Sequence, residues 1–169
     1  MNKNIILSVI GPDKPGIVSD ISEMIKNHAG NIDKSRMVKL GDYFTIMVLI
    51  SINDDHLTNL NEKLNNYSNY EILIHELSTI SHKDDDISHT IHLNGIDNEG
   101  LVYKITNELA KLDINIEELE TNISNAPMSG ISLFSLVAKV SHAKLDYNIL
   151  KEKMNNLAIE LDVNITIEN

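Results

Sequence analysis

This chain has 169 residues, and the residue types that it lacks exclude several classes of fold and function. It contains no cysteine, which excludes disulfides, a thiolate nucleophile and a cysteine-based zinc site. Basic side chains are also scarce: Arg36 is the single arginine, and the formal net charge is −11. Proteins that bind nucleic acid directly usually neutralise its phosphates with a basic patch. We therefore expect no direct contact with nucleic acid.

Long apolar runs and processing signals are missing as well. No apolar run approaches the roughly 18 residues that mark a membrane-spanning helix, and residues 1–4 lead directly into a short apolar run. That opening does not match a signal peptide. The sequence therefore predicts a soluble, cytoplasmic protein with no membrane partner.

Motifs for catalysis or cofactor binding are absent too. The sequence has no Ser/His/Asp grouping, Walker loop or dinucleotide-binding fingerprint. His89 and His92 lie three apart on an expected strand, so they should face opposite sides and form a poor metal pair. His82 beside Asp84–Asp86 offers a possible cation site, although a solvated linker explains these residues better. We expect no enzyme activity, no cofactor and no metal.

What the chain does contain is one distinctive stretch, Gly11–Val18, between an apolar run and a helical pattern. Gly11 permits a sharp exit from a strand, Pro15 suits a helix entry, and Gly16 removes a Cβ from the backbone surface. The result would be a row of free amide N–H groups at a helix N-terminus, which can bind a carboxylate. The alternative is an ordinary strand-to-helix turn.

This stretch occurs twice, which favours a functional role over an ordinary turn. The period is about 80 residues, which indicates a duplicated domain rather than a solenoid. We expect a first domain at 1–80, a linker at 81–86 and a second domain at 87–169. A shift of 84 places Gly11, Asp13, Gly16, Ile17, Val18, Asn31 and Ile32 on Gly95, Asp97, Gly100, Leu101, Val102, Asn115 and Ile116.

Apolar periodicity predicts the same order of elements in both halves, strand, helix, strand, strand, helix, strand. Such a βαββαβ order is typical of an α+β, ferredoxin-like fold, an antiparallel sheet with helices on one face. Ala29-Gly30 should close the first helix, with Gly30 at a C-cap-like position, and Phe44 and Phe134 should be equivalent. The expected elements are Ile5–Ile10, Ile17 to about His28, Ile32–Leu40, Tyr43–Ile52, a helix around Leu57–Leu64 and Ile72–Ile74; then Ile87–Leu93, Leu101–Lys111, Ile116–Ile123, Ile131–Val140, Leu145 to about Ala158 and Leu161–Ile167.

Two such units, each with Gly-x-Asp-x-x-Gly-Ile/Leu-Val followed by Asn-Ile, resemble tandem ACT domains, which are small-molecule sensors. The chain as a whole is similar to the glycine cleavage system transcriptional repressor family. The resemblance implies ligand sites between the first loop and the start of the second strand, at a domain or subunit interface. It assigns ligand binding to Gly11, Asp13, Pro15, Gly16, Ile17, Asn31 and Ile32, and in the second copy to Asp97, Gly100, Leu101, Asn115 and Ile116.

The chemistry of these residues agrees with an amino-acid ligand. Helix amides can bind its carboxylate, and Asn31 or Asp13 can meet its ammonium group, although Asn31 could equally cap its own loop. The second copy replaces Lys14 and Pro15 with Asn98 and Glu99. That change disfavours an anion, so we expect the first copy to be the better ligand site.

The resemblance implies a non-enzymatic regulator that senses glycine or serine and acts on a protein partner, by analogy a transcription activator. Residues 1–80 carry 7 basic and 10 acidic side chains, and residues 81–169 carry 7 and 15, so the second half suits a basic partner better. The polar second strands should pair across a homodimer, pair with each other or be covered by helices. The rival interpretations are a regulatory part of an amino-acid enzyme and a purely structural dimerisation module.

Overall fold

A computed structural model describes residues 2–78, 87–143 and 146–168 of the chain. The chain divides into two compact units, Met1–His82 and Lys83–Asn169. The expected linker at 81–86, including the candidate cation site at His82 and Asp84–Asp86, lies outside the described residues. No helix in the described part of the chain is long and apolar enough to cross a membrane.

Each unit has the expected βαββαβ order, with four antiparallel strands and two helices. The first unit consists of β1 (Asn2–Pro12), α1 (Ile17–Asn27), β2 (Asn31–Leu40), β3 (Tyr43–Asn53), α2 (Asp54–Asn65) and β4 (Glu71–Leu77). The second consists of β5 (Ile87–Ile96), α3 (Leu101–Lys111), β6 (Asn115–Asn125), β7 (Ser132–His142), α4 (Tyr147–Leu161) and β8 (Val163–Glu168).

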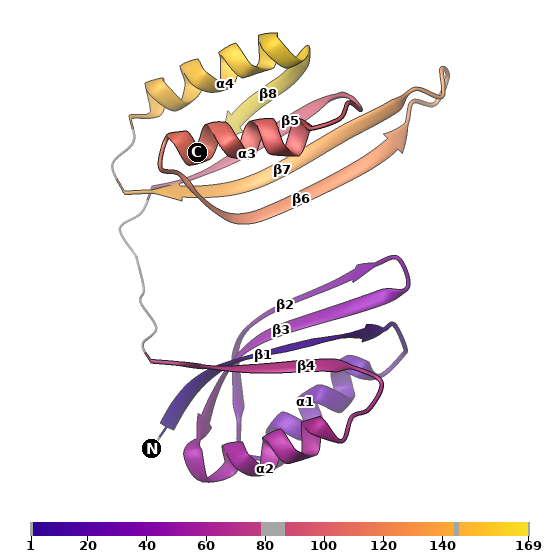
Figure 1. The fold of residues 1–169 in the computed structure, drawn as a ribbon, viewed down its shortest axis with the longest axis vertical. Helices are drawn as coiled ribbons and strands as arrows, with labels where there is room; N and C mark the ends of the chain where they lie inside the picture. The colour runs from indigo at the N-terminus through magenta and orange to yellow at the C-terminus, as the bar shows by residue number, and fades with distance from the viewer. Residues whose placement is uncertain (1, 79–86, 144–145, 169) are drawn as a thin grey trace. The chain divides into compact units, whose positions relative to one another are not determined.

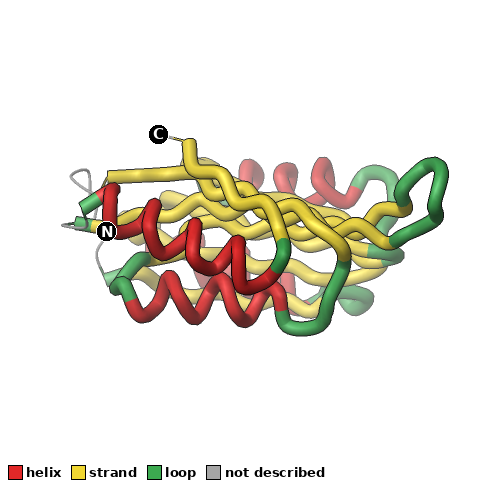
Figure 2. Tube along the Cα trace, turned by 90° about the horizontal axis from the view of Figure 1, so that it is seen from above, coloured by secondary structure: helices red, strands yellow, loops and turns green. Residues whose placement is uncertain are grey.

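The strand order is β2-β3-β1-β4 in one sheet and β6-β7-β5-β8 in the other. Within each unit both helices cover the same face of the sheet, as the ribbon and the tube show (Figures 1 and 2). The predicted α+β, ferredoxin-like fold is therefore confirmed. The outer strands of the two sheets are β2 and β4, and β6 and β8.

Each unit has its own core, made where alternate strand residues meet the apolar stripe of the helices. In the first unit Ile5 and Leu7 from β1 pack with Ile21 and Ile25 from α1. In the second, Ile91 and Leu93 from β5 pack with Ile105 from α3. These side chains are at most 2% exposed, so the helix-facing side of each sheet is dry.

The duplication persists at the level of backbone conformation. Both first helices begin at a left-handed glycine, with φ of 92° at Gly16 and 82° at Gly100. Both end at a left-handed residue, with φ of 55° at Ala29 and 57° at Asp113. The pairing of β1 and β3 sets Gly11 opposite Phe44, and that of β5 and β7 sets Gly95 opposite Phe134, so the equivalence of the two phenylalanines is confirmed.

Several boundaries differ from the sequence-based expectation. β7 begins at Ser132 rather than at Ile131, and the expected helix start at Leu145 lies outside the described residues. Leu161 belongs to α4 rather than to the last strand, because it extends the stripe of Leu157 and is only 8% exposed. The left-handed residue that ends α1 is Ala29, not Gly30. Gly30 is needed for space instead, since a Cβ there would lie 2.9 Å from Cγ2 of Ile25.

Candidate functional site

The loop between β1 and α1 presents the helix N-terminus that the sequence predicts. Gly16 is the N-cap of α1, and its φ of 92° is a conformation that side chains other than glycine adopt only with strain. No side chain caps this end, although the backbone N–H of Ile17 donates a hydrogen bond to the Lys14 carbonyl oxygen at 3.4 Å. Pro15 lies in the turn before the cap rather than at the first helical position, which corrects the expected role of Pro15.

Gly11 is required by an aromatic ring that covers it. A Cβ at this position would lie 2.2 Å from Cδ1 of Tyr70, far inside van der Waals contact. The Tyr70 hydroxyl donates a hydrogen bond to the carbonyl oxygen of Pro12 at 3.0 Å, and its ring stacks on that of Tyr67 with 5.1 Å between centroids. The two tyrosines therefore hold the end of β1 and the start of the loop.

Lys14 completes this arrangement, which we call the tyrosine clamp: Lys14, Tyr67 and Tyr70. The Lys14 ammonium lies 5.1 Å from the centroid of the Tyr67 ring and 5.7 Å from that of Tyr70, at cation–π distance. It also lies 3.7 Å from a carboxylate oxygen of Asp20, which accepts a 2.6 Å hydrogen bond from the Tyr67 hydroxyl. The neighbouring Tyr67 hydroxyl raises the pKa of Lys14, so the lysine stays charged at neutral pH.

Asp13 is also held by its neighbours. Its carboxylate pairs with the ammonium of Lys39 at 2.5 Å, and its backbone N–H donates to the carbonyl oxygen of Asp42 at 2.9 Å. The loop is thereby tied to the β2–β3 turn. A ligand ammonium group at Asp13 would have to compete with Lys39 for the carboxylate.

Asn31 and Ile32 do not lie beside this loop within the same unit. Asn31 pairs with Ser51, which pairs with Asn4, and Gly11 is seven residues farther along β1. At about 3.3 Å per residue the two groups are roughly 23 Å apart, at opposite ends of the sheet. Asn31 instead donates to the carboxylate of Asp33 at 2.7 Å. No single small ligand can therefore contact both groups within one unit, because α1 returns the chain to the far end before β2 begins. The expected site at a domain or subunit interface stays a prediction.

The second unit repeats this layout without the clamp. Asn115 pairs with Ser141, which pairs with Ser88, and Gly95 is again seven residues away. Gly95 faces Val163, whose Cγ1 would lie 2.5 Å from an added Cβ, so an aliphatic side chain takes the place of Tyr70.

The loop of the second unit is consequently less tied down. Asp97 donates its backbone N–H to the carbonyl oxygen of Ser132 at 3.0 Å, as Asp13 does at the first turn. Gly100 caps α3 in open space, Leu101 is buried in the core, and Glu99 provides no side-chain cap. Ile116, like Ile32, packs against the core of its own unit.

The residues that sequence reasoning missed are Tyr67, Tyr70, Asp20 and Lys39. The two tyrosines lie three apart just before the last strand of the first repeat, a pattern that the second repeat lacks. A cavity of about 170 Å³, lined by Lys14 and residues 66–70, adjoins the clamp.

The residues that the structure describes do not form a candidate metal site. No three His, Asp or Glu side chains gather among them as a metal site. His89 is 5% exposed on the helix-facing side of its sheet, whereas His92 faces the other side and lies 3.4 Å from a carboxylate oxygen of Glu168. The prediction that these two histidines face opposite sides is therefore confirmed.

Comparison with known proteins identifies the first unit directly, because the ACT domain family matches residues 3–75. A glycine cleavage system transcriptional repressor of Escherichia coli is 36% identical over 47 residues, which are 28% of this chain and 25% of that protein. The matched segments span between 25% and 56% of the curated relatives, so those proteins' activities do not transfer directly.

Two solved structures match the chain almost from end to end. One, of an unknown protein from Galdieria sulphuraria, is 31% identical with a TM-score of 0.85 and covers 99% of this chain and 98% of its own. Another, of a candidate glycine cleavage system transcriptional repressor, has a TM-score of 0.72 over 99% of this chain and 97% of its own, and at 20% identity it shows the fold alone. The first unit is therefore an ACT domain, and the second unit repeats its fold.

Proposed function

We propose that this protein is a non-enzymatic regulator that senses a small amino acid and acts by contact with a protein partner. The observation that carries the proposal is the uncapped, left-handed start of α1 at Gly16, held in place by the tyrosine clamp. Uncapped helix amides attract a carboxylate, and a loop that is already ordered loses little entropy when a ligand binds.

A small cavity that shares Lys14 with this loop, but none of the assigned site residues, is in keeping with a small ligand. The cavity beside the clamp measures about 170 Å³. At a share of about 30 Å³ for each water-sized atom, it holds roughly six non-hydrogen atoms. Glycine and serine fall within this range, and both are the ligands that the resemblance to the glycine cleavage repressor family implies. We propose that the ligand binds the first unit at Asp13, Pro15 and Gly16. Gly11, which the Tyr70 ring covers, and Ile17, which is 3% exposed, would shape this loop without contacting the ligand.

We propose a separate role for Asn31 and Ile32. Because they lie at the far end of their own sheet, they can flank this ligand only from a second copy of the chain. The exposed edge strand β2 offers backbone groups for such a homodimer. Ligand binding would then shift the packing of the copies and change the affinity for the protein partner, by analogy a transcription activator in glycine and one-carbon metabolism.

A thermal-shift screen of the free amino acids on the full chain tests this proposal. A ligand at 100 times its Kd adds about 2.7 kcal/mol to the stability of the unit that binds it. For a domain of this size, that raises Tm by roughly 10 °C or more. If no amino acid shifts the melting curve, a structural dimerisation module is the better account. A tightly copurifying amino-acid enzyme would instead favour the regulatory-subunit interpretation.

A further inference from the structure

The second unit contains a cavity of about 240 Å³ between α4 and the edge strand β8, far along the chain from either glycine loop. Its floor is apolar: Met154 is 1% exposed and Ile165 9% exposed, and Ile167 lines the same side. At a share of about 30 Å³ for each water-sized atom, the space holds roughly eight non-hydrogen atoms.

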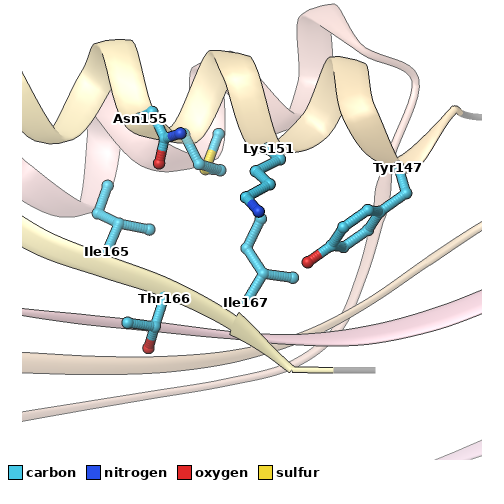
Figure 3. Close-up of a pocket in the computed structure, with 7 residues that line it drawn as sticks. Tyr147, Lys151, Asn155, Ile165, Thr166 and Ile167 are labelled. Atoms are coloured by element: carbon cyan, nitrogen blue, oxygen red, sulfur yellow. The ribbon is translucent and has the colours of Figure 1, made fainter.

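Three polar side chains border this floor from a single helix. Tyr147, Lys151 and Asn155 are spaced four residues apart on α4, so they form one row along the cavity. Figure 3 shows the Tyr147 hydroxyl and the Lys151 ammonium directed toward the same part of the cavity, beside Ile167. Within the described parts of the chain, none of the three polar groups has a hydrogen-bond or ion-pair partner.

The opposite wall is formed by strand β8. Ile165 and Ile167 point toward α4, and Thr166, between them, points away (Figure 3), so Thr166 borders the cavity with its main chain. As an edge strand, β8 offers backbone groups that β5 does not pair.

The Tyr147 ring is fixed in place by an uncommon contact. Its centroid lies 5.3 Å from that of His89, which is 5% exposed and in turn stacks on His142 at 5.4 Å. Neither ring nitrogen of His89 has a hydrogen-bond partner among the described residues. Burying polar atoms without partners is unfavourable, so this packing supports the ring of Tyr147 at a cost to stability.

We propose that this cavity binds a small aliphatic carboxylate that has no α-ammonium group. The aliphatic chain lies against Met154, Ile165 and Ile167, and the carboxylate meets the Lys151 ammonium and the Tyr147 hydroxyl. Lys151 is the one charged side chain among the described residues that line the cavity. An α-ammonium group would add a second positive charge with no carboxylate to pair it, which separates this site from the amino-acid site of the first unit.

The probe for this site is 4-methylpentanoate, which has eight non-hydrogen atoms. Titrated into the ¹⁵N-labelled full chain, it should cause saturable amide shifts in α4 and β8, with a Kd on the order of 1 mM for a ligand of this size. Lys151→Met keeps most of the apolar stem and should weaken binding about five-fold or more. Tyr147→Phe should weaken it as well, since only the hydroxyl is lost.

Lys153→Met is the matched control, because it removes the same charge from the same helix at a residue that does not line the cavity. It should leave the affinity within about two-fold, whereas an effect equal to that of Lys151→Met would reveal only the loss of net charge. Leucine has the same skeleton with an added ammonium group and should bind at least about five-fold more weakly.

Three results would overturn the proposal. The first is the absence of saturable shifts in α4 and β8. The second is binding of leucine as tight as that of 4-methylpentanoate. The third is binding of N-acetylleucine about ten-fold tighter than the free acid, because that would assign the cavity to a peptide C-terminus.

Discussion

Replacing Gly11 with alanine tests whether the tyrosine clamp shapes the candidate ligand loop. The added Cβ would lie 2.2, 2.6 and 2.9 Å from three ring atoms of Tyr70. The ring cannot swing away freely, since its hydroxyl is bonded to the Pro12 carbonyl and its face is stacked on Tyr67. Overpacking of this kind costs about 1–3 kcal/mol, so Gly11→Ala should destabilise the first unit by that amount.

A double-mutant cycle tests whether the Tyr70 ring causes this loss of stability. In a Tyr70→Ala background the ring is gone, and Gly11→Ala should then cost less than about 0.5 kcal/mol. Gly95→Ala offers a parallel in the second unit, where Cγ1 of Val163 lies 2.5 Å from the added Cβ.

Because the chain has two units, a single unfolding transition cannot be assumed. Hydrogen exchange followed by mass spectrometry reports on each unit separately, with β1 as the probe and β5 as an internal reference. Faster exchange in β1 alone is the expected result for Gly11→Ala. An equal cost of Gly11→Ala with and without the Tyr70 ring would refute the clamp as the reason for glycine.

Three further outcomes follow from charge and ionisation. The hydrogen bond between Lys3 and Asp54 lowers the pKa of Asp54 and raises that of Lys3, so this pair stabilises the first unit at neutral pH. The stabilisation is lost as pH falls below about 4 or rises above about 10.5. The stability difference between wild type and Asp54→Asn should therefore vanish in acid. Burial, and after it the hydrogen bond to Asp20, raises the pKa of Tyr67 above 10.0. Ultraviolet titration should therefore show one tyrosine that ionises at higher pH than the others and that Tyr67→Phe removes. If the late-ionising tyrosine persists in Tyr67→Phe, the assignment to Tyr67 is contradicted. With a net charge of −11 the isolated protein should not bind duplex DNA tightly, and sub-micromolar, salt-sensitive binding would show otherwise.

Much of the fold was predictable because both halves of the sequence carry the same turn and helix-cap residues. Gly16 and Gly100 mark the same left-handed caps, and the nearly continuous apolar run within Tyr43–Asn53 marks the inner strand β3. Such patterns reflect local backbone preference and burial, which act over a few residues. The boundary at Leu161 was missed, because a buried leucine fits either a helix stripe or a strand.

The candidate site was predictable only in part, because its decisive contacts join distant residues. Tyr70 covers Gly11 although the two residues are 59 positions apart in the sequence, and Lys39 pairs with Asp13 although these are 26 positions apart. The position of Asn31 depends on strand register, which the spacing Gly16 to Asn31 does not reveal. A glycine covered by a tyrosine that directly precedes a neighbouring strand is a signal that becomes visible only once the strands are paired.

The central claim is that the loop at Gly16, and not its copy at Gly100, binds a small amino acid. Isothermal titration calorimetry of serine and glycine into the wild type, Gly16→Val and Gly100→Val tests it most directly. Both substitutions place a β-branched residue at a left-handed φ, 92° and 82°, so their strain is closely matched. Loss of binding in Gly16→Val with most binding retained in Gly100→Val is the predicted result. Greater damage from Gly100→Val, or equal binding in all three proteins, would contradict the account.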